Sequence, residues 1–221
     1  MKVIFEDLGN VDYKEAWDYQ ELVHKSIVET KESFQNNQKL LFCEHPHVYT
    51  LGKSGKETNL LINPDFLTSI GATYYKINRG GDITYHGPGQ IVGYPIIDLE
   101  RLKIGVKEYI FKLEESIIQL LKNYGIQGSR FEKSTGVWLD TQNPEKARKI
   151  CAIGVRVSKY VTMHGFALNV NTDLNYFNYI NPCGFIDRGV TSMAKELNAP
   201  VDFQKVKEEL KSVIYHVFQF E

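Results

Sequence analysis

Three cysteines and one strand lysine are the residues of this sequence best suited to nucleophilic chemistry. Cys183 lies in "YINPCGF", between a proline and a glycine and away from periodic apolar residues. Cys43 and Cys151 lie inside apolar runs, where a cysteine normally behaves as a small buried hydrophobe. Cys183 is therefore the candidate nucleophile.

A nucleophilic cysteine needs a neighbour that lowers its pKa from about 8.5, because the thiolate is the attacking species. Lys149, in "RKICAIGVRV", is the candidate. Strand alternation predicts that it lies on the more apolar face, together with Cys151, Ile153, Val155 and Val157. An ammonium on such a face loses hydration unless it has a partner. The alternative is a lysine at a strand end whose ammonium reaches solvent.

The histidines allow two further kinds of chemistry. His45 and His47 are two residues apart in "EHPHVY", but a metal site would need a third ligand and would have to accommodate Pro46. We therefore expect no metal and no cofactor. His164 in "VTMHGF" is either a base for Cys183 or a core histidine bonded to the backbone.

The stretch "RGGDITYHGPGQIVGYPI", residues 79–96, is unusually rich in glycine. It is neither a Walker loop, since no Gly-Lys-Ser/Thr follows, nor a dinucleotide fingerprint, since a strand rather than a helix follows. Gly80 and Gly81 allow the backbone to approach a ligand closely. A turn centred on Pro88–Gly89 should project His86 and Gln90 from either side. The alternative is a glycine-rich hairpin without a ligand.

Both helices and strands must position these residues. The order in which they are expected predicts an α+β fold with a mixed, mostly antiparallel sheet flanked by helices. Helices are expected from Asp12 to about Phe34, over 63–71, over 105–125 and, capped by Asp202, at the C-terminal end. The expected strands cover 2–8, 39–52 with an interruption near Pro46, 72–80, 90–99, 126–132, 135–140, 148–159 and 161–171. The length fits a single catalytic domain over residues 1–221.

Bulk properties exclude several classes of protein. The chain has 26 basic and 27 acidic residues and a net charge of −1, without the basic stripe of a nucleic-acid-binding protein. No apolar run approaches about 18 residues, so no membrane span is expected. The odd number of cysteines suits a reducing compartment, and the first residues resemble neither a signal peptide nor a transit peptide. We therefore expect a cytoplasmic protein.

The glycine-rich stretch closely resembles the signature of the lipoyl(octanoyl) transferases, the cysteine/lysine acyltransferases of lipoate biosynthesis. Further blocks resemble that family in the family's order: "EHPHVYTLG", "TGVWLD", "RKICAIGVRV", "VTMHGFALNVN", "INPCG" and "GVTSMAKEL". The similarity extends from about residue 40 to residue 197. Each block alone is weak evidence, but together they are highly specific.

The resemblance implies the fold of the catalytic module shared with lipoate- and biotin-protein ligases. It implies that Cys183 carries the acyl group and that Lys149 is its catalytic partner. Two residues depart from the family pattern, since Asp82 replaces the more usual glutamine and Cys151 the usual alanine. The segments implied to line the acyl pocket comprise Arg79, Gly80, Gly81, Asp82, Ile83, Thr84, Tyr85, His86, Ala152, Ile153, Gly154, Gly165, Phe166 and Ala167.

The implied reaction is transfer of an octanoyl group from octanoyl-acyl carrier protein to a specific lysine, through a thioester on the enzyme's cysteine. The implied acceptors are the lipoyl domains of 2-oxoacid dehydrogenase complexes and the glycine cleavage H protein. Exchange of one thioester for another is nearly isoenergetic, so no ATP is needed. The alternatives are an ATP-dependent lipoate- or biotin-protein ligase, a thiol hydrolase that uses Cys183 with His164, and a non-catalytic module that binds acyl carriers.

Overall fold

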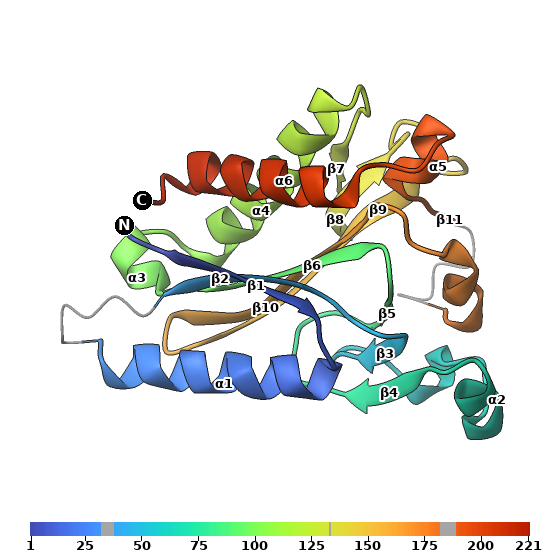
Figure 1. Cartoon of the computed structure of the whole chain (residues 1–221), viewed down its shortest axis with the longest axis horizontal. Coiled ribbons are helices and arrows are strands. Elements are labelled where there is room, and N and C mark those ends of the chain that lie inside the picture. Colours follow the sequence, from blue (N-terminus) through green and yellow to red (C-terminus); the bar gives the residue numbers. More distant parts are fainter. Residues whose placement is uncertain (32–37, 133, 182–188) are drawn as a thin grey trace.

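A large mixed sheet organises the chain in the computed structural model, which describes residues 1–31, 38–132, 134–181 and 189–221 (Figure 1). Parallel pairing joins β1 to β2 and β11 to β9, whereas the other neighbours in this sheet are antiparallel. This arrangement confirms the predicted α+β class. In spatial order the strands are β1 (Ile4–Asn10), β2 (Lys39–Glu44), β6 (Gln90–Ile96), β10 (Val161–Asn169), β9 (Arg148–Ser158), β8 (Ser134–Leu139) and β7 (Ser129–Phe131), and β11 (Gly189–Val190) also pairs with β9.

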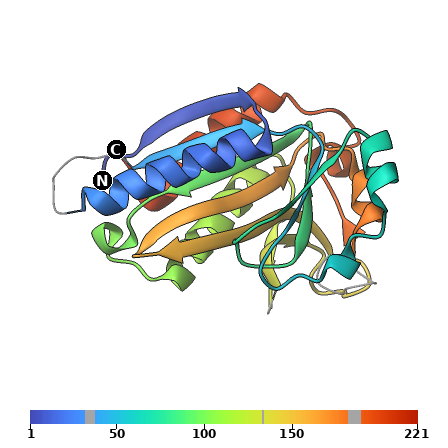
Figure 2. The same cartoon turned by 90° about the horizontal axis from the view of Figure 1, so that it is seen from below.

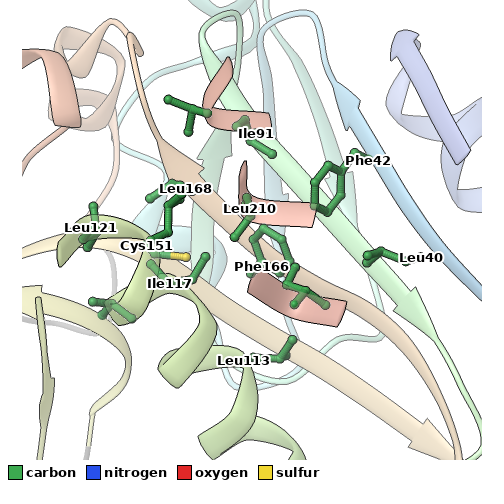
Figure 3. Packing of buried hydrophobic residues seen from close by; sticks show 14 of the residues in the cluster. Leu40, Phe42, Ile91, Leu113, Ile117, Leu121, Cys151, Phe166, Leu168 and Leu210 are labelled. Carbon is green, nitrogen blue, oxygen red and sulfur yellow. The ribbon is translucent and has the colours of Figure 1, made fainter. Parts of the chain in front are cut away.

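The central strands β2, β6 and β10 are buried on both faces, and their residues alternate between two packed layers. On β2, Leu40 and Phe42 pack in the core under α4 (Val106–Asn123) and α6 (Phe203–Phe218). Leu41 and Cys43 pack on the opposite face, against α1 (Tyr13–Glu29). The helices lie above and below the sheet in Figure 1, and Figure 3 shows the first core from close by.

The predicted helices begin where their capping residues lie. Asp12, Asn63 and Asp202 each accept a backbone N–H of the first turn of their helix. Helix α1 ends at Glu29, earlier than predicted, and Phe34 lies outside the described residues. The short helices are α2 (Pro64–Ser69), α3 (Leu99–Leu102) and α5 (Met193–Leu197), with 3₁₀ turns η1 (Glu57–Asn59) and η2 (Leu174–Tyr179).

No helix within the four described ranges is both long and apolar enough to cross a membrane.

A second, small sheet lies beside α1 and is formed by β4 (Thr73–Lys76), β3 (Val48–Leu51) and β5 (Ile83–His86) (Figure 2). The interruption predicted near Pro46 is the point where the chain leaves the large sheet after β2 and enters the small one at β3. Strands β5 and β6 belong to different sheets, so the expectation of a glycine-rich hairpin is wrong. The turn between them carries the chain from one sheet to the other.

Candidate functional site

A cavity of about 440 Å³ lies between the large sheet and the segment from Arg79 to His86. Side chains and backbone of β6, β9 and β10 form one wall, and residues 79–84 and His86 form the other. Strands β8 and β11 and the start of β9 also contribute lining residues. The apolar lining includes Val92, Ile110, Ile153, Val155, Phe166, Ala167 and Val190.

The glycine-rich segment is packed directly on strand β9. The Gly80 amide donates to the Val155 carbonyl at 3.0 Å. A Cβ atom on Gly154 would lie 2.9 Å from the Gly80 carbonyl oxygen, closer than real Cβ atoms approach. Gly81 has φ +87°, which favours glycine. These glycines therefore allow the two walls of the cavity to meet.

A buried arginine holds this segment against the small sheet. Arg79 is 7% exposed, and its guanidinium donates to the Thr50 carbonyl at 2.7 Å, the Thr50 hydroxyl at 3.0 Å and the Gly80 carbonyl at 3.0 Å. These acceptors replace water around a cation that would otherwise be costly to bury. Asp82 accepts from the side-chain amide of Asn59 at 2.7 Å and from the Ile83 amide at 2.6 Å. The Asp82 carboxylate thus helps attach β5 to η1.

The turn at Pro88–Gly89 brings together the side chains of His86 and Gln90, which were expected to project to opposite sides. Gly89 has φ +77°, and the Gln90 amide donates to the Gly87 carbonyl, so the predicted centre of the turn is confirmed. The directions of the side chains were predicted wrongly. His86 Nδ1 donates to Gln90 Oε1 at 2.9 Å, and Gln90 Nε2 donates to Asn169 Oδ1 at 2.9 Å. A buried polar chain thus runs from β5 to β10 along the cavity.

His45 and His47 lie in different environments. His45 donates from Nδ1 to the Val11 carbonyl at 2.8 Å and accepts at Nε2 from the Tyr94 hydroxyl at 2.7 Å. His47 is hydrogen-bonded to the Tyr85 hydroxyl at 2.7 Å and stacks on Tyr176, with ring centroids 4.1 Å apart. Both side chains are therefore engaged in structural contacts of separate clusters.

Three buried histidines beside the cavity are held neutral. Burial lowers the pKa of His45 to about 4 and the pKa values of His86 and His164 to about 3. His164 is 2% exposed, lies on β10 with φ +58°, and donates from Nε2 to the side-chain oxygen of Asn78 at 3.0 Å. A histidine with so low a pKa is a poor general base near neutral pH.

Lys149 lines the cavity and lies on a face of β9 that simple alternation does not predict. Val137 pairs with Cys151, whereas the next residue of β8, Trp138, pairs with Lys149. Moving one residue along β8 thus corresponds to moving two residues along β9. Ile150 is therefore the extra residue of a β-bulge. Ile150 and Cys151 both enter the core, while Lys149 is paired with Trp138 and lines the cavity. The prediction that Lys149 shares a face with Cys151 is therefore wrong.

The two described cysteines are poor nucleophiles. Cys43 and Cys151 are fully buried, on opposite faces of the large sheet. Burial raises the pKa of both thiols, which disfavours the thiolate. Figure 3 shows Cys151 among apolar side chains. Cys183, the candidate nucleophile, lies outside the described residues.

Most positions assigned to the acyl pocket from sequence do line the cavity. Tyr85 does not: its ring packs between Tyr49 and Tyr176 in the core of the small sheet. Tyr13, Gln90, Tyr94, Trp138 and Asn169 also line the cavity and were not assigned to it. The sequence did carry a signal for Gln90 and Asn169, which are polar residues at the ends of apolar strands. The predicted positions on the cavity wall are Arg79, Gly80, Gly81, Asp82, Ile83, Thr84, His86, Lys149, Ala152, Ile153, Gly154, Gly165, Phe166 and Ala167.

A family model of a catalytic domain matches the part of the chain that carries this sheet and cavity. The model of the lipoyl protein ligase A/B catalytic domain family matches residues 12–214. A protein named octanoyltransferase from Parabacteroides distasonis is 54% identical over 215 residues, which cover 97% of each chain. Another protein of that name, from Bacteroides fragilis strain YCH46, is 56% identical and covers 95% of each chain. The chain belongs to the lipoyl protein ligase A/B catalytic domain family.

Solved structures show the same fold at low identity. A bi-partite lipoate protein ligase from Thermoplasma acidophilum has a TM-score of 0.72 and 14% identity, covering 100% of this chain and 85% of its own. A lipoate-protein ligase A bound with ATP has a TM-score of 0.70, 14% identity and coverage of 100% and 87%. A biotin protein ligase from Aquifex aeolicus in complex with biotin and ATP has a TM-score of 0.54, 12% identity and coverage of 99% and 70%. The predicted likeness to the catalytic module of these ligases is confirmed.

Proposed function

We propose that this chain is an octanoyltransferase, which moves an octanoyl group from octanoyl-acyl carrier protein to a lysine of a lipoyl domain. The observation that carries the proposal is the identity of 54–56% to proteins of that name over at least 95% of the chain. The cavity supports it, because its lining combines apolar side chains with Lys149. The acceptors are lipoyl domains of 2-oxoacid dehydrogenase complexes and the glycine cleavage H protein.

The first half-reaction forms an acyl-enzyme. The Cys183 thiolate, stabilised by the Lys149 ammonium, attacks the thioester carbonyl of the donor. The carrier's sulfur leaves as a thiolate and takes a proton from Lys149. A new thioester joins the octanoyl group to Cys183, and Lys149 is left neutral. Burial of Cys43 and Cys151, which raises the pKa of both thiols, supports the choice of Cys183.

The second half-reaction uses the neutral Lys149 as a base. Acylation removes the negative charge of Cys183, so the ammonium form of Lys149 loses an ion-pair partner and its pKa falls. The amine of the acceptor lysine attacks the acyl-enzyme carbonyl and gives a proton to Lys149. The amide forms, the Cys183 thiolate leaves, and the original ion pair is restored. One lysine thus serves both steps.

A direct test is to incubate the protein with octanoyl-acyl carrier protein without ATP and to measure its intact mass. We expect the mass of one octanoyl group to appear on wild type, and peptide mapping to place it on Cys183. Cys183→Ser should lose the adduct. The control Cys151→Ala removes a buried thiol and introduces the residue usual in resembling sequences, so it should keep the adduct.

An adduct on Cys43 or Cys151 would contradict the assignment of Cys183. Lys149→Ala should keep its fold but slow both acylation and transfer, and unchanged rates would remove the lysine from the mechanism. A ligase would instead require ATP and free acid and would tolerate Cys183→Ser. Requirement for ATP would therefore replace the proposed reaction by the ligase alternative.

A further inference from the structure

The indole of Trp138 lies beside the ammonium of Lys149. The two residues are direct partners across strands β8 and β9. Lys149 Nζ lies 4.6 Å from the centroid of the indole ring, within the range of a cation–π interaction. Trp138 is 3% exposed and Lys149 is half-buried, so the cation contacts a buried ring. Both side chains line the cavity.

Two further contacts hold the indole of Trp138 in place. Trp138 Nε1 donates to the Ser134 carbonyl at 3.1 Å. The Phe131 ring packs against the indole with a centroid separation of 5.4 Å and an interplanar angle of 49°. A tryptophan fixed in this way offers a preorganised ring to the cation.

A glycine and the bulge bring the lysine to the indole. Gly136, with φ +119°, lies where a Cβ would be 2.5 Å from the Cys151 carbonyl oxygen and 3.6 Å from Lys149 Cε. The absence of a side chain at Gly136 therefore lets β8 approach the Cys151 carbonyl of β9, and the lysine stem lies at van der Waals distance from the same position. The Gly136 amide donates to the carboxylate of Glu114 at 3.0 Å, which attaches this part of β8 to α4.

We propose that the indole of Trp138 is a positioning group for Lys149, which holds the lysine side chain in the lining of the cavity and stabilises its ammonium form. The catalytic meaning of this contact rests on the proposed function, in which Lys149 is the cation of the first half-reaction. A desolvated cation on an indole face is stabilised more than an exposed one. After acylation the indole remains against Lys149, so it also influences how readily the lysine becomes neutral.

The free enzyme provides a test that needs no substrate. Trace labelling of amines with acetic anhydride at a series of pH values reports the neutral fraction of each lysine, and peptide mass spectrometry isolates Lys149. We compare wild type, Trp138→Leu and Trp138→Phe. The leucine variant should lower the labelling midpoint of Lys149 by roughly 0.5 to 1 pH unit, and phenylalanine, a weaker cation–π partner, by less.

Controls separate this effect from a general structural one. Thermal unfolding reports whether each variant is folded, and the labelling midpoint of Lys112, whose ammonium donates to the Val217 carbonyl of α6, should not move. If Trp138→Leu does not fold, the labelling midpoint of Lys149 must still be lowered in Trp138→Phe. A Lys149 midpoint that is unchanged or raised in the folded variants overturns the proposal.

Kinetics then test the link to catalysis. Single-turnover transfer from the preformed acyl-enzyme should reach its plateau at lower pH in Trp138→Phe than in wild type, because Lys149 becomes neutral at lower pH. An unchanged pH profile together with a shifted labelling midpoint would contradict the catalytic role while leaving the contact itself established. Absence of an acyl-enzyme in wild type would instead contradict the proposed function.

Discussion

Buried neutral histidines should make the protein lose stability between pH 7 and pH 5. The unfolded chain binds a proton at each histidine below a pKa of about 6.5. The folded chain does not, because burial lowers the pKa of His45 to about 4 and the pKa values of His86 and His164 to about 3. The unfolded state therefore binds more protons in this window, and stability falls as the pH falls.

The size of the effect follows from proton linkage. One bound proton changes the free energy of unfolding by about 1.4 kcal/mol per pH unit, so each such histidine contributes a loss of about 2 kcal/mol between pH 6.5 and pH 5. Three histidines set an upper limit of about 6 kcal/mol, a large part of the stability of a typical domain. The carboxyls of Glu6, Glu115 and Glu196 have lowered pKa values and therefore contribute below this window.

Urea unfolding at pH 7, 6 and 5 measures the loss directly. His86→Asn is the informative variant, because its amide can still donate to Gln90 but does not titrate. We expect the free energy of unfolding of His86→Asn to fall by about 2 kcal/mol less than that of wild type between pH 7 and pH 5. The control is His216→Asn, on the exposed side of α6, which should leave the pH dependence unchanged. A wild-type free energy of unfolding that is constant from pH 7 to pH 5 would refute the reasoning.

Three further predictions concern packing and are measured by urea unfolding. Gly154→Ala should cost about 1–3 kcal/mol, because the new Cβ would lie 2.9 Å from the Gly80 carbonyl oxygen, whereas Gly189→Ala on β11 should change stability by less than about 0.5 kcal/mol. Leu210→Ala should cost about 2–5 kcal/mol, since this fully buried side chain of α6 packs on the sheet. Asp202→Ala should cost about 1 kcal/mol through loss of the N-cap of α6. A free energy of unfolding equal to that of wild type in Gly154→Ala, Leu210→Ala or Asp202→Ala would contradict the contact assigned to that residue.

Local signals in the sequence were sufficient for most elements. Apolar alternation and periodicity located the main helices and strands, and capping residues placed the starts of α1, α2 and α6. These signals act over a few residues, so they can be read without knowledge of the fold. That residues 1–221 form a single catalytic domain, with Cys183 as its nucleophile, stays a prediction.

The sequence could not show how strands of two sheets meet. "HGPGQ" predicts a turn, but membership of β5 and β6 in different sheets depends on partners far along the chain. The hydrogen bond between His86 and Gln90 follows from that crossing. The register between β8 and β9 is equally non-local, and its bulge at Ile150 turns Lys149 toward the cavity.

The sequence by itself determined the class of fold, the candidate chemistry of Cys183 and Lys149, and most of the positions around the cavity. The fold class and the candidate chemistry depend on residue types and on spacings along the chain, whereas the positions around the cavity come from the resemblance to the lipoyl(octanoyl) transferases. Only the tertiary structure decided that Lys149 lies against Trp138 rather than beside Cys151, because one extra residue in a strand reverses the faces of its neighbours. A single bulge therefore decides which way the lysine points.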